Sequence, residues 1–140
     1  MLRNDVLAWI DYAKRDIELV DREMSYSRNP RLRPYEIILH HCHQCAEKML
    51  KAYIINSGGT PGYIHDLNRL RKMCIGYNND FDGKRITDHC IYLDAFWNVK
   101  YPDFTVSIDA SHVTRGINGA KRIFDFVSVR LGLGKSFHTT

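Results

Sequence analysis

Hydrophobic residues in the first part of the chain recur in alternating steps of four and three. The series consists of Val6, Ile10, Ala13, Ile17, Val20 and Met24. This spacing places them on one stripe of an α-helix whose opposite face carries charged residues. Pro30 and Pro34 disfavour helical backbone at the residues before them, so we predict that this first helix ends within the polar segment 25–34.

Later segments show the same helical period. We predict a long helix over about 35–57, a short helix over 67–77, a fourth from about 84 through Trp97 to the break at 101–103, and a fifth from Asp109 to Leu131. Glycine adopts the left-handed backbone that closes a helix and proline cannot continue its hydrogen bonds, so the segment 58–62 ends the second helix. Asp109 is a good N-cap for the fifth.

The predicted helices define the fold class. Long helices joined by loops of roughly five to ten residues predict an all-α fold, an antiparallel up-and-down four-helix bundle with one additional short helix. Only residues 104–108 alternate in a way that suits a strand, so we predict essentially no sheet. A chain of 140 residues suits one domain. We assign residues 1–131 to a single domain and residues 132–140 to a flexible C-terminal tail.

Composition excludes a membrane span. The chain is 44% hydrophobic and 26% charged, and no window approaches the roughly 18 unbroken apolar residues that a span needs. The N-terminal residues lack the apolar core of a signal peptide, so we expect a cytoplasmic protein. The four cysteines, Cys42, Cys45, Cys74 and Cys90, fall in predicted helices, and we expect reduced thiols.

Net charge limits the ligand class only weakly. A formal charge of +4 from 20 basic and 16 acidic residues permits an anionic ligand without the dense basic surface of strong nucleic-acid binders. Arg28, Arg31 and Arg33 concentrate positive charge on one segment, which we interpret as a solvated loop.

A polar stripe follows the second predicted helix. His40, Gln44, Glu47 and Lys51 recur at steps of four, three and four, opposite the apolar stripe. One interpretation is a groove for a nucleotide or a partner's charged loop, with Lys48 and Lys51 contacting phosphate. The other is a solvated face whose Glu47–Lys51 pair contributes only about 0.3–0.5 kcal/mol.

The histidines and cysteines suggest metal sites only weakly. His41, Cys42 and Cys45 have helical spacings that could hold two ligands, but a structural zinc needs four and no second close pair exists. His65-Asp66 fits the ligand order of metal-dependent HD-type phosphohydrolases, although Asp66 more simply caps the third helix. We expect no metal and no cofactor.

Aromatic residues near the end of the fourth helix allow two interpretations. Phe96, Trp97 and Tyr101 could stack a base, as in single-strand binders, or complete the core and a dimer seam.

The second helix carries a resemblance to a known family. Gln44, the run Ala46-Glu47-Lys48 and Lys51 on one helix resemble the signature of the HEPN family. Further matches cover the chain from about residue 5 to 130. They are Trp9, Ala13 and Asp16, the run His65-Asp66-Leu67, and Lys100-Tyr101-Pro102-Asp103. The resemblance implies an up-and-down helical bundle, commonly a homodimer.

The resemblance also implies a function. HEPN proteins include nucleotide-binding modules and partners of minimal nucleotidyltransferases in toxin–antitoxin pairs. We therefore expect a nucleotide- or nucleic-acid-binding module beside a nucleotidyltransferase-type partner. The expected ligand-binding residues are Gln44, Glu47, Lys48, Lys51, His65, Lys100, Tyr101 and Asp103.

Two alternatives stay open. Some HEPN members are metal-independent ribonucleases with an Arg followed four to six residues later by His. Here Lys100 occupies the arginine position, and residues 105–107, where the histidine would be needed, are Thr, Val and Ser. Without a histidine there, that position offers no near-neutral base, and we assign no catalytic residue. A ribonuclease would need a displaced histidine such as His40 or His112. The other alternative is a non-catalytic dimerisation or interaction module.

Overall fold

The described part of the structure is helical. The structure, a computed structural model, describes residues 1–26, 29, 32–103 and 107–137. Its elements are α1 (Asn4–Tyr26), α2 (Tyr35–Asn56), α3 (Leu67–Ile75), η2 (Asn79–Asp82), α4 (Lys84–Asp94), η3 (Trp97–Lys100) and α5 (Ala110–Arg130). These residues form no strand, which confirms the all-α prediction, and residues 104–106 of the one possible strand lie outside the described part. Among the described helices, none is long and apolar enough to cross a membrane.

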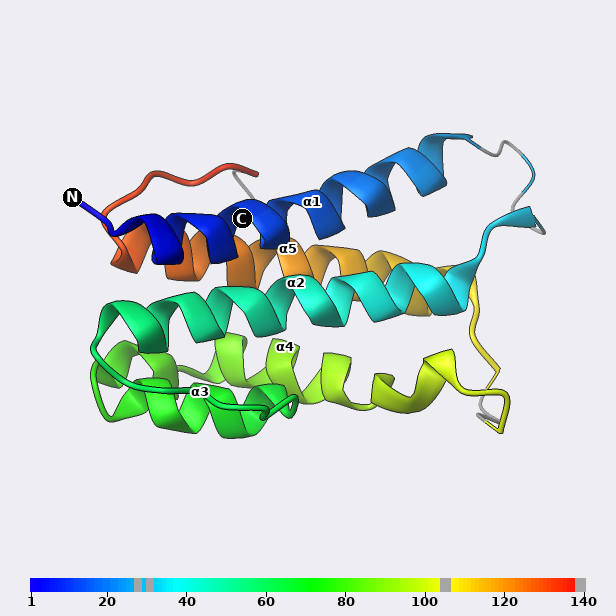
Figure 1. The fold of residues 1–140 in the computed structure, drawn as a ribbon. Helices are drawn as coiled ribbons and strands as arrows, with labels where there is room; N and C mark the ends of the chain where they lie inside the picture. Colours follow the sequence, from blue (N-terminus) through cyan, green and yellow to red (C-terminus); the bar gives the residue numbers. More distant parts are fainter. Residues whose placement is uncertain (27–28, 30–31, 104–106, 138–140) are drawn as a thin grey trace.

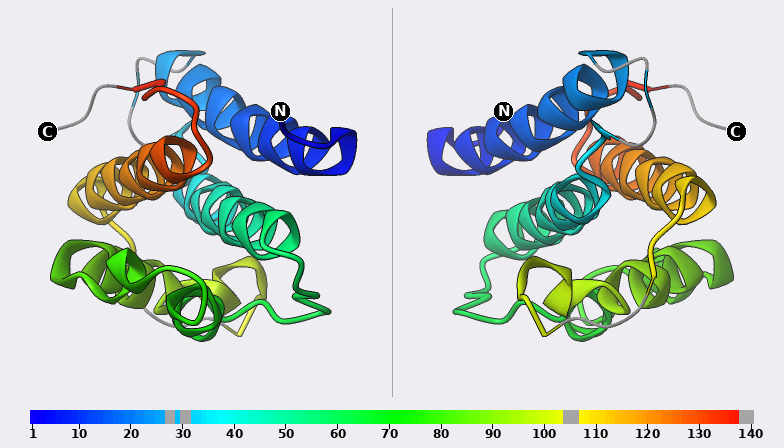
Figure 2. Two further views of the ribbon diagram at one scale, coloured as in Figure 1. Left: turned by 90° about the vertical axis from the view of Figure 1, so that its left-hand side faces the viewer. Right: turned by 90° about the vertical axis from the view of Figure 1, so that its right-hand side faces the viewer.

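The long helices pack as an antiparallel bundle. In Figure 1, α1 and α4 run in one direction and α2 and α5 in the other. The end-on views of Figure 2 show α1 on one side of the α2–α5 pair and α3 with α4 on the other. Because α2 contacts α1, α3, η3, α4 and α5, it is the central helix. This arrangement confirms the four-helix bundle with one additional short helix.

Helix α2 buries the apolar stripe that its sequence predicts. Cys42, Cys45 and Met49 are fully buried. All four cysteines are free and buried. Burial raises the pKa of their thiols, to about 12 for Cys74. The thiols therefore stay protonated, which makes them weak nucleophiles.

The third and fourth helices are shorter than predicted. Helix α3 ends at Ile75, so Tyr77 lies beyond it, half exposed. Helix α4 ends at Asp94, and Trp97 belongs to the 3₁₀ turn η3. In 3₁₀ geometry, residues three apart lie on the same side. The tighter winding thus buries both Phe96 and Val99.

The segment after α5 returns along the helix. Gly132, with φ at 83°, adopts the left-handed backbone that permits this turn. The buried carboxylate of Asp125 accepts hydrogen bonds from the backbone N–H groups of Ser136 and Phe137, at 2.7 and 3.1 Å. The Phe137 ring packs edge-on against Phe124. The flexible tail over 132–140 stays a prediction, since the structure describes contacts for part of it and residues 138–140 lie outside the described part.

Candidate functional site

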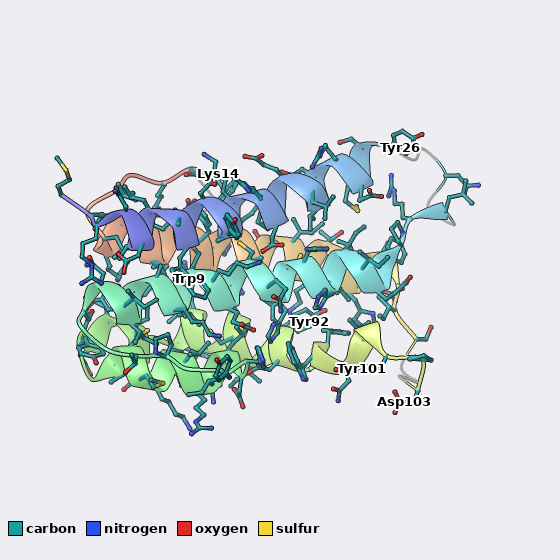
Figure 3. All side chains as sticks on the ribbon, in the orientation of Figure 1. Trp9, Lys14, Tyr26, Tyr92, Tyr101 and Asp103 are labelled. Atoms are coloured by element: carbon teal, nitrogen blue, oxygen red, sulfur yellow. The ribbon has the colours of Figure 1, made fainter. Side chains whose placement is uncertain are left out.

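A row of polar side chains on α2 lies between α1 and η3. We call it the α2 polar face and define it as His41, Gln44, Glu47, Lys48 and Lys51. Trp9 of α1 lies at its edge, between α1 and α2 in Figure 3, with its ring centre 5.9 Å from Lys51 Nζ.

Glu47 and Lys51 form a buried ion pair. Lys51 Nζ donates to Glu47 Oε2 at 3.1 Å, and the side chains of Lys51 and Glu47 are 5% and 6% exposed respectively. The interpretation of the stripe as a solvated face is therefore wrong for these two residues. A buried pair makes each ion dependent on the other, because removing one leaves an uncompensated charge in a low dielectric.

His65 extends this pair to the surface. Its Nδ1 lies 3.1 Å from both carboxylate oxygens of Glu47. An ionised carboxylate only accepts, so Nδ1 carries the proton and Nε2 of the neutral ring is an acceptor. The half-exposed His65 ring stacks on Trp97, with centroids 4.9 Å apart and planes at 15°. The result is an exposed ring whose orientation is fixed by a buried acid and an indole.

His43 and Asp94 form a neighbouring pair beneath this stack. The buried His43 donates through Nε2 to Asp94 Oδ1 at 3.1 Å, and its ring centre lies 4.9 Å from that of Trp97. Its Nδ1, buried without a hydrogen-bond partner among the described residues, lies 3.9 Å from Glu47 Oε1. His43 therefore lies between the carboxylates of Glu47 and Asp94.

Asp94 also holds the start of α3. The backbone N–H groups of Leu67 and Asn68 donate to its two carboxylate oxygens at 2.8 and 3.0 Å. Burial pushes the pKa of Asp94 up, but the hydrogen bonds from His43, Asn68 and Leu67 outweigh burial and lower the pKa below its usual value. Together with the N-cap Asp66, which accepts from Arg69 N–H, Asp94 satisfies the open donors of the first turn. The predicted capping role of Asp66 is confirmed.

A second ion pair lies nearer the start of α2. Asp16 of α1, mostly buried, accepts from Lys48 Nζ at 2.5 Å and from His41 Nδ1 at 2.8 Å. Both lysines of the α2 polar face are thus paired with carboxylates. Their predicted contacts with phosphate stay predictions, and they require a ligand that competes with these carboxylates.

The other predicted ligand residues are spread over the bundle. Gln44 is partly exposed on α2, between His41 and Lys48. Tyr101 and Asp103 are exposed on the turn after η3, near the end of the bundle where α2 begins (Figure 3), whereas Glu47 and Lys51 belong to the second half of α2. The side chain of Lys100 lies outside the described part.

The histidines considered as displaced bases have other contacts. His112 completes the capping box of α5, where its Nδ1 accepts from Asp109 N–H at 3.2 Å. The ring of His40 lies edge-on to that of His41. Among the described residues, no three His, Cys, Asp or Glu side chains are arranged to share a metal ion.

His43 is the site residue that sequence reasoning missed. Its position four residues before Glu47 was the available signal, since that spacing places both on one helix face. Asp16 lies 25 residues along the chain from its partner His41, and Asp94 lies 51 residues from its partner His43. No local pattern predicts such pairings.

Comparison with known proteins identifies the family. The model of the HEPN domain matches residues 6–130 of this chain. Among solved structures, TT1696 from Thermus thermophilus is similar, with a TM-score of 0.74 and 18% identity over 91% of this chain and 99% of that chain. At this identity the similarity shows a shared fold alone. No curated protein matches the chain. Because the family model covers nearly the whole chain, this protein belongs to the HEPN family.

Proposed function

We propose that this HEPN protein binds a nucleotide or a nucleic-acid segment on the α2 polar face and acts beside a nucleotidyltransferase-type partner. The observation that supports binding is the half-exposed His65 ring, oriented by Glu47 and stacked on Trp97. Aromatic stacks bind unpaired bases in single-stranded nucleic acid. The acceptor Nε2 of His65 suits the amino groups on base edges.

The two lysines of the face have separate roles in this proposal. The side chain of Lys48 is 21% exposed, whereas that of Lys51 is 5% exposed. Lys48 therefore contacts a ligand phosphate, in competition with Asp16. Lys51 instead pairs with Glu47, and Glu47 in turn orients His65.

Binding titrations with charge-matched variants test this proposal. The ligands are AMP, ATP and a short single-stranded RNA at two salt concentrations, because phosphate contacts make affinity fall with salt. Lys48→Ala and His65→Ala should each weaken binding about tenfold, the effect expected for one charged contact or one base stack. The control is Lys14→Ala, an exposed lysine of α1 pointing away from α2 (Figure 3). Equal affinities for all three variants would remove the α2 polar face from the proposal.

The partner is the second element of the proposal, and its support is the family membership. Co-expression with a small nucleotidyltransferase from an adjacent reading frame should yield a stable complex on size-exclusion chromatography with light scattering. The same measurement on the protein alone tests the expected homodimer. Separate elution of the two proteins would contradict the partnership.

RNA cleavage is a second candidate function, which the His65–Glu47 contact favours. A histidine whose Nδ1 is held by a buried carboxylate presents Nε2 as a general base. His65 fits that arrangement better than His112, whose Nδ1 is used in helix capping. Cleavage of RNA in EDTA that is lost in His65→Ala and kept in His112→Ala would establish it. Absence of cleavage by the unmodified protein would leave the binding module alone.

A further inference from the structure

A second charged region lies between α4 and α5. In the end-on views of Figure 2, α5 and α2 lie side by side, and α4 lies on the side of that pair away from α1. A cavity of about 530 Å³ opens between α4 and α5, and we call it the α4–α5 cavity. Its polar lining includes Arg85, His89, Arg122, Asp125, Arg130 and Lys135.

Positive charge in this cavity exceeds negative charge. Asp125 is the carboxylate of the lining, and it is buried and occupied by backbone N–H groups of the C-terminal segment. Within the described residues, no carboxylate forms an ion pair with Arg85, Arg122 or Lys135. A concave surface lined by one sign of charge concentrates ions of the other sign.

Arg130 adds a partly satisfied donor. Its Nη1 donates to the Phe126 carbonyl at 3.0 Å, and its guanidinium lies over the Phe126 ring. Its Nε is 3.3 Å from a carboxylate oxygen of the exposed Asp80. That Nε is nevertheless buried without an aligned hydrogen bond among the described residues. A buried guanidinium nitrogen of this kind still has donor capacity to offer.

His89 lies beside these positive charges. Burial lowers the pKa of His89, and the charges of Arg122, Arg115 and Arg85 lower it further, against an opposing effect of Asp88. His89 is half-buried between the helices because Gly119 of α5 has no side chain, and a Cβ there would lie 3.2 Å from His89 Nδ1.

The remaining lining is apolar. Ile86, Ile123, Phe126 and Val129 form it. A concave site with an apolar wall and several convergent cations suits a ligand that has both an anionic and an apolar part. Arginine forks match phosphate oxygens with two parallel hydrogen bonds.

We infer that the α4–α5 cavity binds a small phosphorylated molecule such as a nucleotide, with its phosphates on Arg85 and Arg122 and its apolar part against Ile86 and Phe126. This site is separate from the α2 polar face and does not depend on the function proposed for that face. Its concave shape favours a free small molecule over an extended RNA backbone.

The test follows ATP and inorganic pyrophosphate binding by calorimetry, together with the His89 ring signals by NMR. Bound phosphate should shift those signals and raise the pKa of His89, because an anion stabilises the imidazolium. Arg122→Gln and the more exposed Arg85→Gln should each weaken ATP binding about tenfold or more, as expected for loss of a charged bidentate contact. The matched control is Arg69→Gln, on the exposed side of α3 and outside the cavity lining.

Each outcome decides the inference. ATP binding that requires Arg85 and Arg122, persists in His65→Ala and perturbs His89 supports it, whatever the α2 polar face does. Equal ATP affinity in Arg69→Gln, Arg85→Gln and Arg122→Gln overturns it, as does binding without change at His89. Arginine-dependent binding of a short RNA with none of ATP overturns the assignment to a small molecule.

Discussion

The α2 polar face and the α4–α5 cavity differ in how their positively charged side chains are paired. On the face, Lys48 and Lys51 each have a carboxylate within 3.1 Å. In the cavity, the lining carboxylate Asp125 is already occupied by backbone donors, and several cations lack an ion pair among the described residues. The net charge of +4 cannot distinguish these two cases. The two regions differ in which charged groups the fold pairs with one another and which it leaves able to bind a ligand.

This difference predicts different costs of substitution. Groups in a satisfied buried network stabilise the fold, so their removal should lower the free energy of unfolding. Cations gathered without partners repel one another, so removing one should cost little stability and should change anion binding.

The largest effect is expected at Glu47. Glu47→Gln leaves Lys51 buried without a counter-charge and should lower the free energy of unfolding by about 3–5 kcal/mol, measured by denaturant titration. The double variant Glu47→Leu/Lys51→Met removes both charges and should recover most of that loss. A loss below about 1 kcal/mol in the single variant would show that the pair contributes as little as a surface pair.

A smaller effect is expected at Asp94. Asp94→Asn removes the charge that the first turn of α3 and His43 share, and we expect a loss of about 1–2 kcal/mol near neutral pH. The folded-state pKa of Asp94 is lowered, so its contribution is present above the usual carboxyl pKa of 3.8 and is lost as pH falls through the folded value. Denaturation at pH 6 and pH 3 should show the difference between the two proteins narrowing at low pH. A constant difference would contradict this.

Lys48→Ala should have a modest effect on stability. Lys48 is partly exposed, and Asp16 keeps its contact with His41, so we expect a loss of about 1 kcal/mol or less. Thermal or denaturant unfolding beside Lys14→Ala measures it. A loss as large as that of Glu47→Gln would mean that Asp16 depends on Lys48 as Lys51 depends on Glu47.

The smallest stability change is expected in the cavity. Arg122→Gln should change the free energy of unfolding by less than about 0.5 kcal/mol near neutral pH. Arg122→Gln should raise the pKa of His89 part of the way toward its usual value, because burial still lowers that pKa. An NMR titration of the His89 ring signals measures the change. Because the pKa of His89 is lower in the folded protein, the free energy of unfolding decreases as pH falls from 6.5, the usual histidine value, through the folded-state pKa. Arg122→Gln should lose less of this free energy over the same pH range than the unmodified protein does. An unchanged His89 pKa would place Arg122 too far away to act.

The sequence predicts the fold better than the site for a physical reason. Helical periodicity is local, so the stripes of α1, α2 and α5 could be identified from spacing alone. The ends of α3 and α4 could not, because η3 depends on packing Phe96 and Val99 against the core. Spacing correctly aligned Glu47 with Lys51, but their burial follows from contacts with α1 and from His65.

The cavity was beyond sequence reasoning for a related reason. Arg85 and Arg122 belong to different helices, 37 positions apart in the sequence, and neither lies in a recognisable motif. Arg28, Arg31 and Arg33 could be singled out from the sequence only because they lie close together along the chain. Charge that converges through tertiary packing leaves no local signal.

The contact between Asp125 and the backbone after α5 has a practical consequence for shortening this protein. A stop codon after Leu131 would preserve every long helix, yet it would remove the N–H groups of Ser136 and Phe137 and leave a buried carboxylate without these donors. Such a carboxylate would need water or other donors in place of the lost backbone groups. The smallest fragment that retains this contact therefore ends at Phe137, and an affinity tag belongs beyond that residue or at the N-terminus.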